Sequence, residues 1–200
     1  MSYQFWGILS GVLGLFSGAW YLVRIFRREV HPHITSWLLW TLIALAMLAS
    51  YWSAGAKGGD HIWVAVVGLV NPLLITLVAW RVGSWNKPDH LDWACVLLSV
   101  TSLLLWWVVQ GDKDLSLYSL LLAILADACA VGPMIRACVK DPTIDRPGPW
   151  ALFGVASAVN MLAISEHTFA NYIYPIYMTV GALTIATLLW RGNVRASRNV

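Results

Sequence analysis

The sequence has little charge. Only 12% of its 200 residues are Asp, Glu, Lys or Arg, whereas 59% are hydrophobic and the mean hydropathy is +0.67. Because a soluble domain carries roughly 25% charged residues, a water-soluble globule is excluded, and the lipid bilayer is the expected surrounding of the chain. The net charge of +3 is small and scattered, which argues against a nucleic-acid partner.

Cysteine is also scarce. The three cysteines, Cys95, Cys129 and Cys138, are dispersed within or beside apolar runs. An odd, dispersed set argues against a disulfide framework and against a cysteine-based metal site. No metal and no cofactor is expected.

The apolar residues gather into seven runs. A spanning helix needs about 20 mainly apolar residues, because each residue rises about 1.5 Å through a hydrocarbon core of about 30 Å. The runs cover residues 4–23, 34–54, 62–80, 92–110, 115–138, 149–165 and 171–190. The first run is too long for a signal peptide and lacks a basic flank before it, so we interpret it as a helix. The sequence predicts an all-α membrane protein with seven transmembrane helices.

The basic residues predict how these helices are oriented. Of the 13 lysines and arginines, all except Lys57 and Lys113 lie near the ends of the first, third and fifth runs or in the C-terminal tail. Cytoplasmic loops collect Lys and Arg, so we expect the N-terminus outside and the C-terminus inside. The compact loops favour a bacterial inner (plasma) membrane, crossed several times.

Two parts of the sequence follow the same plan. Each part has a basic helix end, then a loop that contains proline, then a helix that begins with tryptophan. The first part runs from Arg24 to Trp37 and the second from Arg136 to Trp150. Three helices end on the side opposite to their start, so one additional crossing gives a second triplet the direction of the first. We predict a 3+1+3 arrangement of parallel triple-helix repeats, in residues 1–82 and 113–200, joined by a linker helix within 83–112. Such repeats place a substrate site near the membrane midplane.

Two stretches resemble a known superfamily. The first runs from Gly132-Pro133 through Lys140-Asp141-Pro142 to Pro149-Trp150 and Asn160; the second runs from Ser36-Trp37 to Tyr51-Trp52 and on to Asn71. They are similar to the fifth and sixth helices and to the second and third helices of the SWEET, SemiSWEET and PQ-loop transporters. The resemblance implies a 3+1+3 fold and transport of a small polar molecule.

The sequence also departs from that pattern. The Pro-Gln dipeptide is absent, Ser17-Gly18 stands where a kinking proline is expected, and Tyr174-Pro175-Ile176-Tyr177 stands where the sugar carriers have Pro-Asn. The missing asparagine makes a sugar a less favoured substrate. The bacterial vitamin-precursor carriers of the Pnu (nicotinamide riboside) type share the 3+1+3 plan, and the many Trp and Tyr residues here suit a flat aromatic ligand.

Two polar residues lie near the centres of predicted spans. Asp127 is the only acidic or basic residue near the centre of any run, where a carboxylate is costly unless it is paired, hydrated or protonated. We predict a cation-binding or proton-accepting group in a water-filled cavity; the alternative is a protonated side chain bonded to a neighbouring helix. Asn71 lies at nearly the same depth, and its amide suits a neutral polar ligand, although an interhelical hydrogen bond explains it equally well.

Further residues complete the predicted site. We assign two more residues to substrate binding, together with Asp127 and Asn71. Asn160 lies toward the outer end of the sixth run, and Tyr177 lies in the seventh run, one turn deeper than Tyr174. The predicted gating residues are Trp37, Trp40, Trp150, Tyr174, Pro72, Pro133 and Pro175. The tryptophans are expected to close an inner gate, and proline frees a backbone carbonyl where a helix hinges. Anchoring at the membrane interface is the alternative for the aromatic residues.

The function that these features favour is transport. We expect a facilitative or proton-linked carrier of a sugar, nucleoside, vitamin precursor or similar small-molecule substrate, working by alternating access between two triple-helix bundles. A seven-helix receptor or sensor that binds a ligand without moving it is the alternative. An enzyme is not expected, because one buried carboxylate supplies no acid pair, Ser–His set or metal cluster. The sequence does not name the substrate, and both proton-coupled transport and a homo-oligomer are compatible with it.

Overall fold

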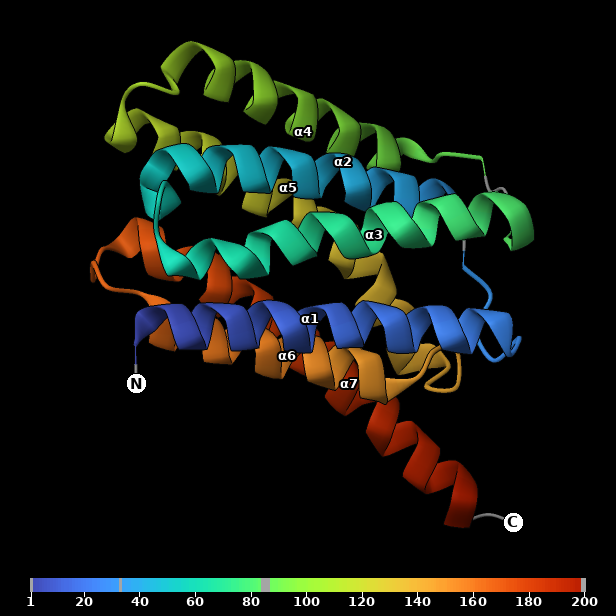
Figure 1. Ribbon diagram of the computed structural model, residues 1–200. Helices are drawn as coiled ribbons and strands as arrows, with labels where there is room; N and C mark the ends of the chain where they lie inside the picture. The colour runs from blue at the N-terminus through green and yellow to red at the C-terminus, as the bar shows by residue number, and fades with distance from the viewer. Residues whose placement is uncertain (1, 33, 84–86, 199–200) are drawn as a thin grey trace.

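The computed structural model describes residues 2–32, 34–83 and 87–198, and within these ranges every regular element is helical. The described α-helices, shown in Figure 1, are α1 (Tyr3–Phe26), α2 (Ile34–Tyr51), α3 (Trp63–Val82), α4 (His90–Val109), α5 (Lys113–Lys140), α6 (Pro147–Asn160) and α7 (Phe169–Arg198). A π-helical segment, η1 (Trp52–Ala56), and two 3-10 segments, η2 (Asp60–Ile62) and η3 (Met161–Ala163), extend them. The predicted all-α architecture is confirmed.

Most of these helices can cross a bilayer. Among the described residues, six segments are long and apolar enough, namely Tyr3–Phe26, Ile34–Ala56, Asp60–Val82, His90–Val109, Lys113–Lys140 and Phe169–Gly192. In a membrane the backbone must satisfy its own hydrogen bonds, which a helix does. The run at 149–165 forms a shorter element, because α6 has 14 residues and η3 adds three. These lengths are consistent with an integral membrane protein.

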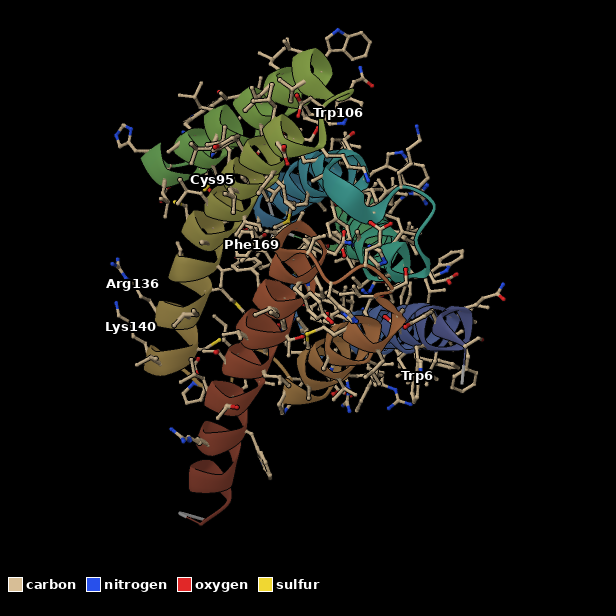
Figure 2. The ribbon with its side chains drawn as sticks, turned by 90° about the vertical axis from the view of Figure 1, so that its left-hand side faces the viewer. Trp6, Cys95, Trp106, Arg136, Lys140 and Phe169 are labelled. Carbon is tan, nitrogen blue, oxygen red and sulfur yellow. The ribbon has the colours of Figure 1, made fainter. Side chains whose placement is uncertain are left out.

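The chain crosses the bundle back and forth between two ends (Figure 1). The N-terminus and the α2–α3, α4–α5 and α6–α7 connections lie at one end, which we call the N-terminal end. The α1–α2, α3–α4 and α5–α6 connections lie at the other, which we call the basic end because most lysines and arginines are near it. Arg136 and Lys140, on the last turns of α5, point away from the bundle there (Figure 2).

Six of the described helices pack in a closed ring. In this ring α3 packs against both α1 and α2, and α7 packs against both α5 and α6. The ring is completed by two further contacts, the α1–α6 seam and the α2–α5 seam. The remaining helix, α4, packs on α2 and α5 and covers the second seam.

Small side chains allow these close contacts. The buried face of α1 consists largely of glycine and serine, and a Cβ added at Gly14 would lie only 2.8 Å from Cγ1 of Val67 on α3. In α4, Ser102 is buried and donates to the carbonyl of Ser119 on α5 at 2.8 Å. Residues without bulk let membrane helices approach closely, while large side chains such as Leu97 and Val108 remain exposed on α4.

Candidate functional site

A central cavity of about 130 Å³ lies between six of the helices. Its lining residues are Ser17, Gly18, Tyr21, Trp37, Trp40, Ala44, Met47, Gly68, Asn71, Pro72, Ile75, Asp127, Val131, Pro149, Trp150, Phe153, Tyr174 and Met178. Every described α-helix except α4 contributes to this lining. The cavity therefore lies inside the ring of these six helices.

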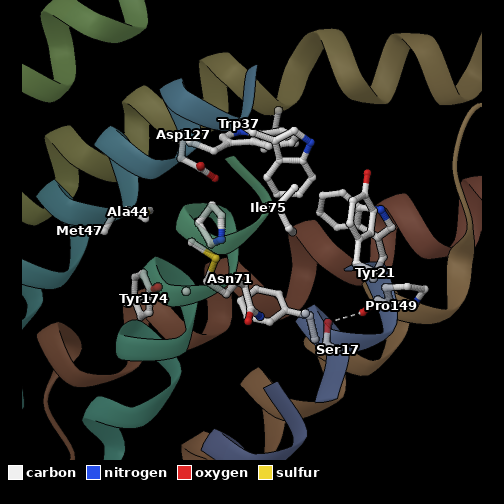
Figure 3. Close-up of a pocket in the computed structure, with 18 residues that line it drawn as sticks. Ser17, Tyr21, Trp37, Ala44, Met47, Asn71, Ile75, Asp127, Pro149 and Tyr174 are labelled. Carbon is white, nitrogen blue, oxygen red and sulfur yellow. Dashed lines mark hydrogen bonds between the residues drawn. The ribbon is translucent and has the colours of Figure 1, made fainter. Parts of the chain in front are cut away.

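Among the described residues of this lining, Asp127 is the one Asp, Glu, Lys, Arg or His. It comes from the middle of α5, and Figure 3 shows its carboxylate pointing into the cavity. One carboxylate oxygen accepts a hydrogen bond of 2.7 Å from the hydroxyl of Tyr177 on α7. The side chain is partly buried, so the protein anchors the carboxylate on one side and leaves it open to the cavity on the other.

Asn71 faces the same cavity from α3. Its Nδ2 donates to the carbonyl oxygen of Gly14 on α1 at 2.9 Å, and its amide lies directly against Gly18, where any Cβ would overlap it. The amide therefore fastens α3 to α1, which is the interhelical bond that the sequence left as an alternative. Its edge still lines the cavity together with Pro72.

Aromatic rings close the end of the cavity that faces the basic end. The rings of Tyr21 and Trp37 have centroids 5.1 Å apart, those of Trp37 and Trp40 are 5.0 Å apart, and those of Trp40 and Trp150 are 6.0 Å apart. Such tilted and edge-on pairs are favourable arrangements of aromatic side chains. We call Tyr21, Trp37, Trp40 and Trp150 the aromatic layer.

Beyond the aromatic layer is a second cavity, the vestibule, of about 290 Å³. The two cavities share all four residues of the aromatic layer. The other walls of the vestibule come from the α1–α2 connection, the first turn of α4, the last turns of α5 with Pro133, and the α5–α6 connection. The aromatic layer therefore separates the central cavity from a space at the basic end.

Asp145 holds two members of the aromatic layer. It is 3% exposed, and its Oδ2 accepts hydrogen bonds from the Tyr21 hydroxyl at 3.3 Å and from Trp150 Nε1 at 3.0 Å. The backbone N–H of Arg146 donates to its other oxygen at 2.6 Å. Burial raises the pKa of the Asp145 carboxyl, and the bonds from Trp150, Arg146 and Tyr21 only partly offset this. A loop carboxylate thus ties α1 to α6 at the basic end.

This raised pKa predicts a pH-dependent stability. A carboxyl group whose pKa is higher in the folded than in the unfolded chain makes the fold more stable at low pH, where the group is neutral. This stabilisation is complete below the unfolded pKa of about 4 and is lost as pH rises through the folded pKa. We expect the melting temperature of wild type in detergent to fall, relative to Asp145→Asn, as pH rises above 4. Hydrogen bonds from Thr143 lower the pKa of Asp141, so Asp141→Asn is a control of opposite sign. Parallel curves for wild type and Asp145→Asn would refute this.

Polar contacts at the N-terminal end of the bundle join α6 to η2 and α2 to α7. Asn160, at the end of α6, is fully buried, and its Nδ2 donates to the carbonyl oxygen of His61 in η2 at 2.8 Å. The hydroxyl of Tyr51, at the end of α2, donates to the carbonyl oxygen of Asn171 on α7 at 2.8 Å. The rings of Tyr51 and Tyr174 also pack together, with centroids 4.9 Å apart. We call these contacts the outer seal.

The structure brings most of the residues predicted for the site to one place. The central cavity is lined by Asp127, Asn71, Pro72, Trp37, Trp40, Trp150 and Tyr174. Tyr177 reaches it only through its bond to Asp127, Pro133 lines the vestibule, and Pro175 is on α7 outside both linings. Asn160 lies away from both cavities, in the outer seal.

Sequence reasoning missed two important residues. Tyr21 belongs to the aromatic layer, and Asp145 is the buried acceptor that holds it. Asp145 stands five residues before Trp150 in a short proline-containing loop. That spacing is the one signal in the sequence that connects the loop acid with the aromatic layer.

Comparisons with protein-family models, with curated proteins and with solved structures give no match to this chain.

Proposed function

We propose that this chain is a membrane transporter of a small polar metabolite that works by alternating access between two triple-helix bundles. The observation that carries the proposal is a central cavity bounded by six helices, with a vestibule at one end and a polar seal at the other. A carrier needs a site that can be opened toward either side in turn. The loops are too short to form a separate catalytic domain.

The helix contacts support a repeat. When α1 is exchanged with α5, α2 with α6 and α3 with α7, the contacts of α3 with α1 and α2 become those of α7 with α5 and α6. The same exchange turns the α1–α6 seam into the α5–α2 seam. In this proposal residues 1–82 and 113–200 are the moving bundles, 83–112 is the linker, and α6 with η3 completes a seventh crossing.

The proposal assigns roles to both ends of the cavity. The aromatic layer is the gate on the cytoplasmic side, where the positive-inside tendency puts the basic end, and the outer seal is the gate on the opposite side. A fold of this kind with a PQ-loop-like plan is expected in a bacterial inner membrane. The receptor alternative uses the same cavity but needs it to open on one side only.

Cysteine labelling distinguishes a carrier from a receptor. Ala44 lines the central cavity, so we expect Ala44→Cys to react with a membrane-impermeant maleimide added from either side, in right-side-out and in inverted vesicles. The background carries Cys129→Ala, while the buried Cys95 and Cys138 report any unfolding. Leu45→Cys, exposed on the surface of the bundle, is the matched control and is expected to stay unreactive in lipid. Reaction from one side only would contradict a carrier and favour a receptor.

A further inference from the structure

We propose that the central cavity binds a small quaternary ammonium ion, with the carboxylate of Asp127 as its counter-ion and aromatic side chains as its walls. The inference deepens the proposed function and rests on the same cavity. It follows from the charge of the lining, its aromatic content, the small number of its free hydrogen-bonding groups and the size of the cavity.

The charge of the lining favours a cation. Asp127 offers a carboxylate, and neither lysine, arginine nor histidine is among the described lining residues. An anion would meet only repulsion, and a zwitterion would leave its own carboxylate without a partner in a mostly apolar space. A single positive charge is the complement of this lining, because a buried charge requires a partner.

Aromatic side chains surround the same space. They come from four helices: Tyr21 from α1, Trp37 and Trp40 from α2, Trp150 and Phe153 from α6, and Tyr174 from α7. The faces of aromatic rings attract cations, and cages of this kind are the usual binding sites of methylated ammonium groups, which need no hydrogen-bond acceptors.

Several polar groups around the cavity are bonded within the protein. Ser17 Oγ donates to the carbonyl oxygen of Pro149 at 2.8 Å, and Asn71 Nδ2 donates to Gly14. Trp150 Nε1 and the Tyr21 hydroxyl both donate to Asp145. A sugar brings many hydroxyl groups, and those without a partner in this mostly apolar lining would each cost about 1–3 kcal/mol. The lining therefore favours a ligand with few polar atoms over a sugar.

The volume limits the size of the ligand. The cavity measures about 130 Å³, and an engineered protein cavity of about 150 Å³ holds one benzene molecule. A trimethylammonium group with a short substituent is of that size. A nucleoside or a disaccharide is much larger and does not fit unless the helices separate.

Three probes whose branched head groups have the same shape test the inference on the purified full chain. Choline is a cation, 3,3-dimethylbutan-1-ol is its uncharged isostere, and glycine betaine is the zwitterion. By isothermal titration calorimetry in detergent we expect choline to bind at least about 30-fold more tightly than either of the others, as a desolvated cation–π site with a carboxylate requires. Equal affinity for choline and the alcohol, or for choline and betaine, would overturn the inference.

A pair of variants shows whether the binding is in this cavity. Ala44→Phe adds an aromatic ring to a space of about one ring, so we expect it to abolish choline binding, whereas Leu45→Phe, outside the cavity, leaves binding unchanged. Equal binding by wild type and a folded Ala44→Phe protein would overturn the assigned site.

Uptake of radiolabelled choline into liposomes with a negative interior separates this inference from the proposed function. Binding with the expected charge preference but without uptake would support the ligand class and contradict transport. Two-sided labelling of Ala44→Cys without any charge preference would support transport and contradict the ligand class.

Discussion

Replacing Asp127 with asparagine is expected to reduce uptake of a cationic substrate by about 30-fold or more. Losing one partner of a desolvated charge pair typically costs about 2–5 kcal/mol, and each 1.4 kcal/mol changes an affinity about tenfold. Asparagine keeps an oxygen that can accept the bond from the Tyr177 hydroxyl, so the fold should be retained. Initial uptake rates in liposomes, beside a melting curve for each protein, measure the effect.

Two substitutions accompany this variant. Asp114→Asn removes the same charge from the exposed first turn of α5. Asp114 is 13 residues before Asp127, which is about 20 Å along the helix, so this variant should leave uptake unchanged. Tyr177→Phe leaves the carboxylate but removes its hydrogen bond, and should reduce uptake only several-fold, since one such bond contributes about 1 kcal/mol. A folded Asp127→Asn protein with the wild-type uptake rate would contradict the role of Asp127.

The helices themselves are readily predicted from this sequence. Membrane helices need long apolar runs, so the six long segments of the structure match runs that composition alone identifies. The sixth run at 149–165 is the exception, because the α-helix ends at Asn160 and the chain tightens into η3. The apolar run continues past that point, but the α-helix does not, and a hydropathy pattern cannot detect the difference.

The depth of a residue is predictable, whereas the direction of its side chain is not. Counting residues from the ends of their runs predicts that Asp127 and Asn71 lie at one depth. In the structure both residues line the same cavity. Asn160 points instead toward η2, where its partner His61 is 99 residues away in sequence. The rotation of a helix about its axis depends on tight contacts such as Gly14 against Val67, and these arise only when the helices pack.

The residues that the sequence did not reveal are those that act through partners far away in the chain. Tyr21 looks like one of many interfacial aromatic residues, and Asp145 looks like an ordinary acid of a loop. Their bond joins positions 124 residues apart. Similarly, a depth argument finds no lysine or arginine for Asp127, and the structure supplies a tyrosine hydroxyl in its place. Polar groups in a membrane protein are paired, but pairing between distant helices leaves no periodic pattern.

The outer seal gives the second large expected effect. Asn160→Ala removes the hydrogen bond that joins α6 to η2 and leaves the buried carbonyl of His61 unpaired, which costs about 1–3 kcal/mol in the sealed state alone. If the bundles alternate, that cost shifts the population toward the state open at the N-terminal end. We expect maleimide added from that side to label Ala44→Cys about 5-fold faster or more, since about 1.4 kcal/mol is a tenfold change and the smallest expected cost is about 1 kcal/mol.

The same helix offers a control for this prediction. Ser157 is one turn earlier on α6 and fully buried, but its Oγ bonds to the carbonyl oxygen of Phe153 within the helix. Ser157→Ala therefore loses a buried hydrogen bond without loosening the contact between the bundles, and labelling of Ala44→Cys should stay at the parent rate. Cys95, fully buried against the bundle, must stay unlabelled in both proteins, because its reaction would indicate unfolding. Equal acceleration by Asn160→Ala and Ser157→Ala, or by neither, would mean that the outer seal is not a gate.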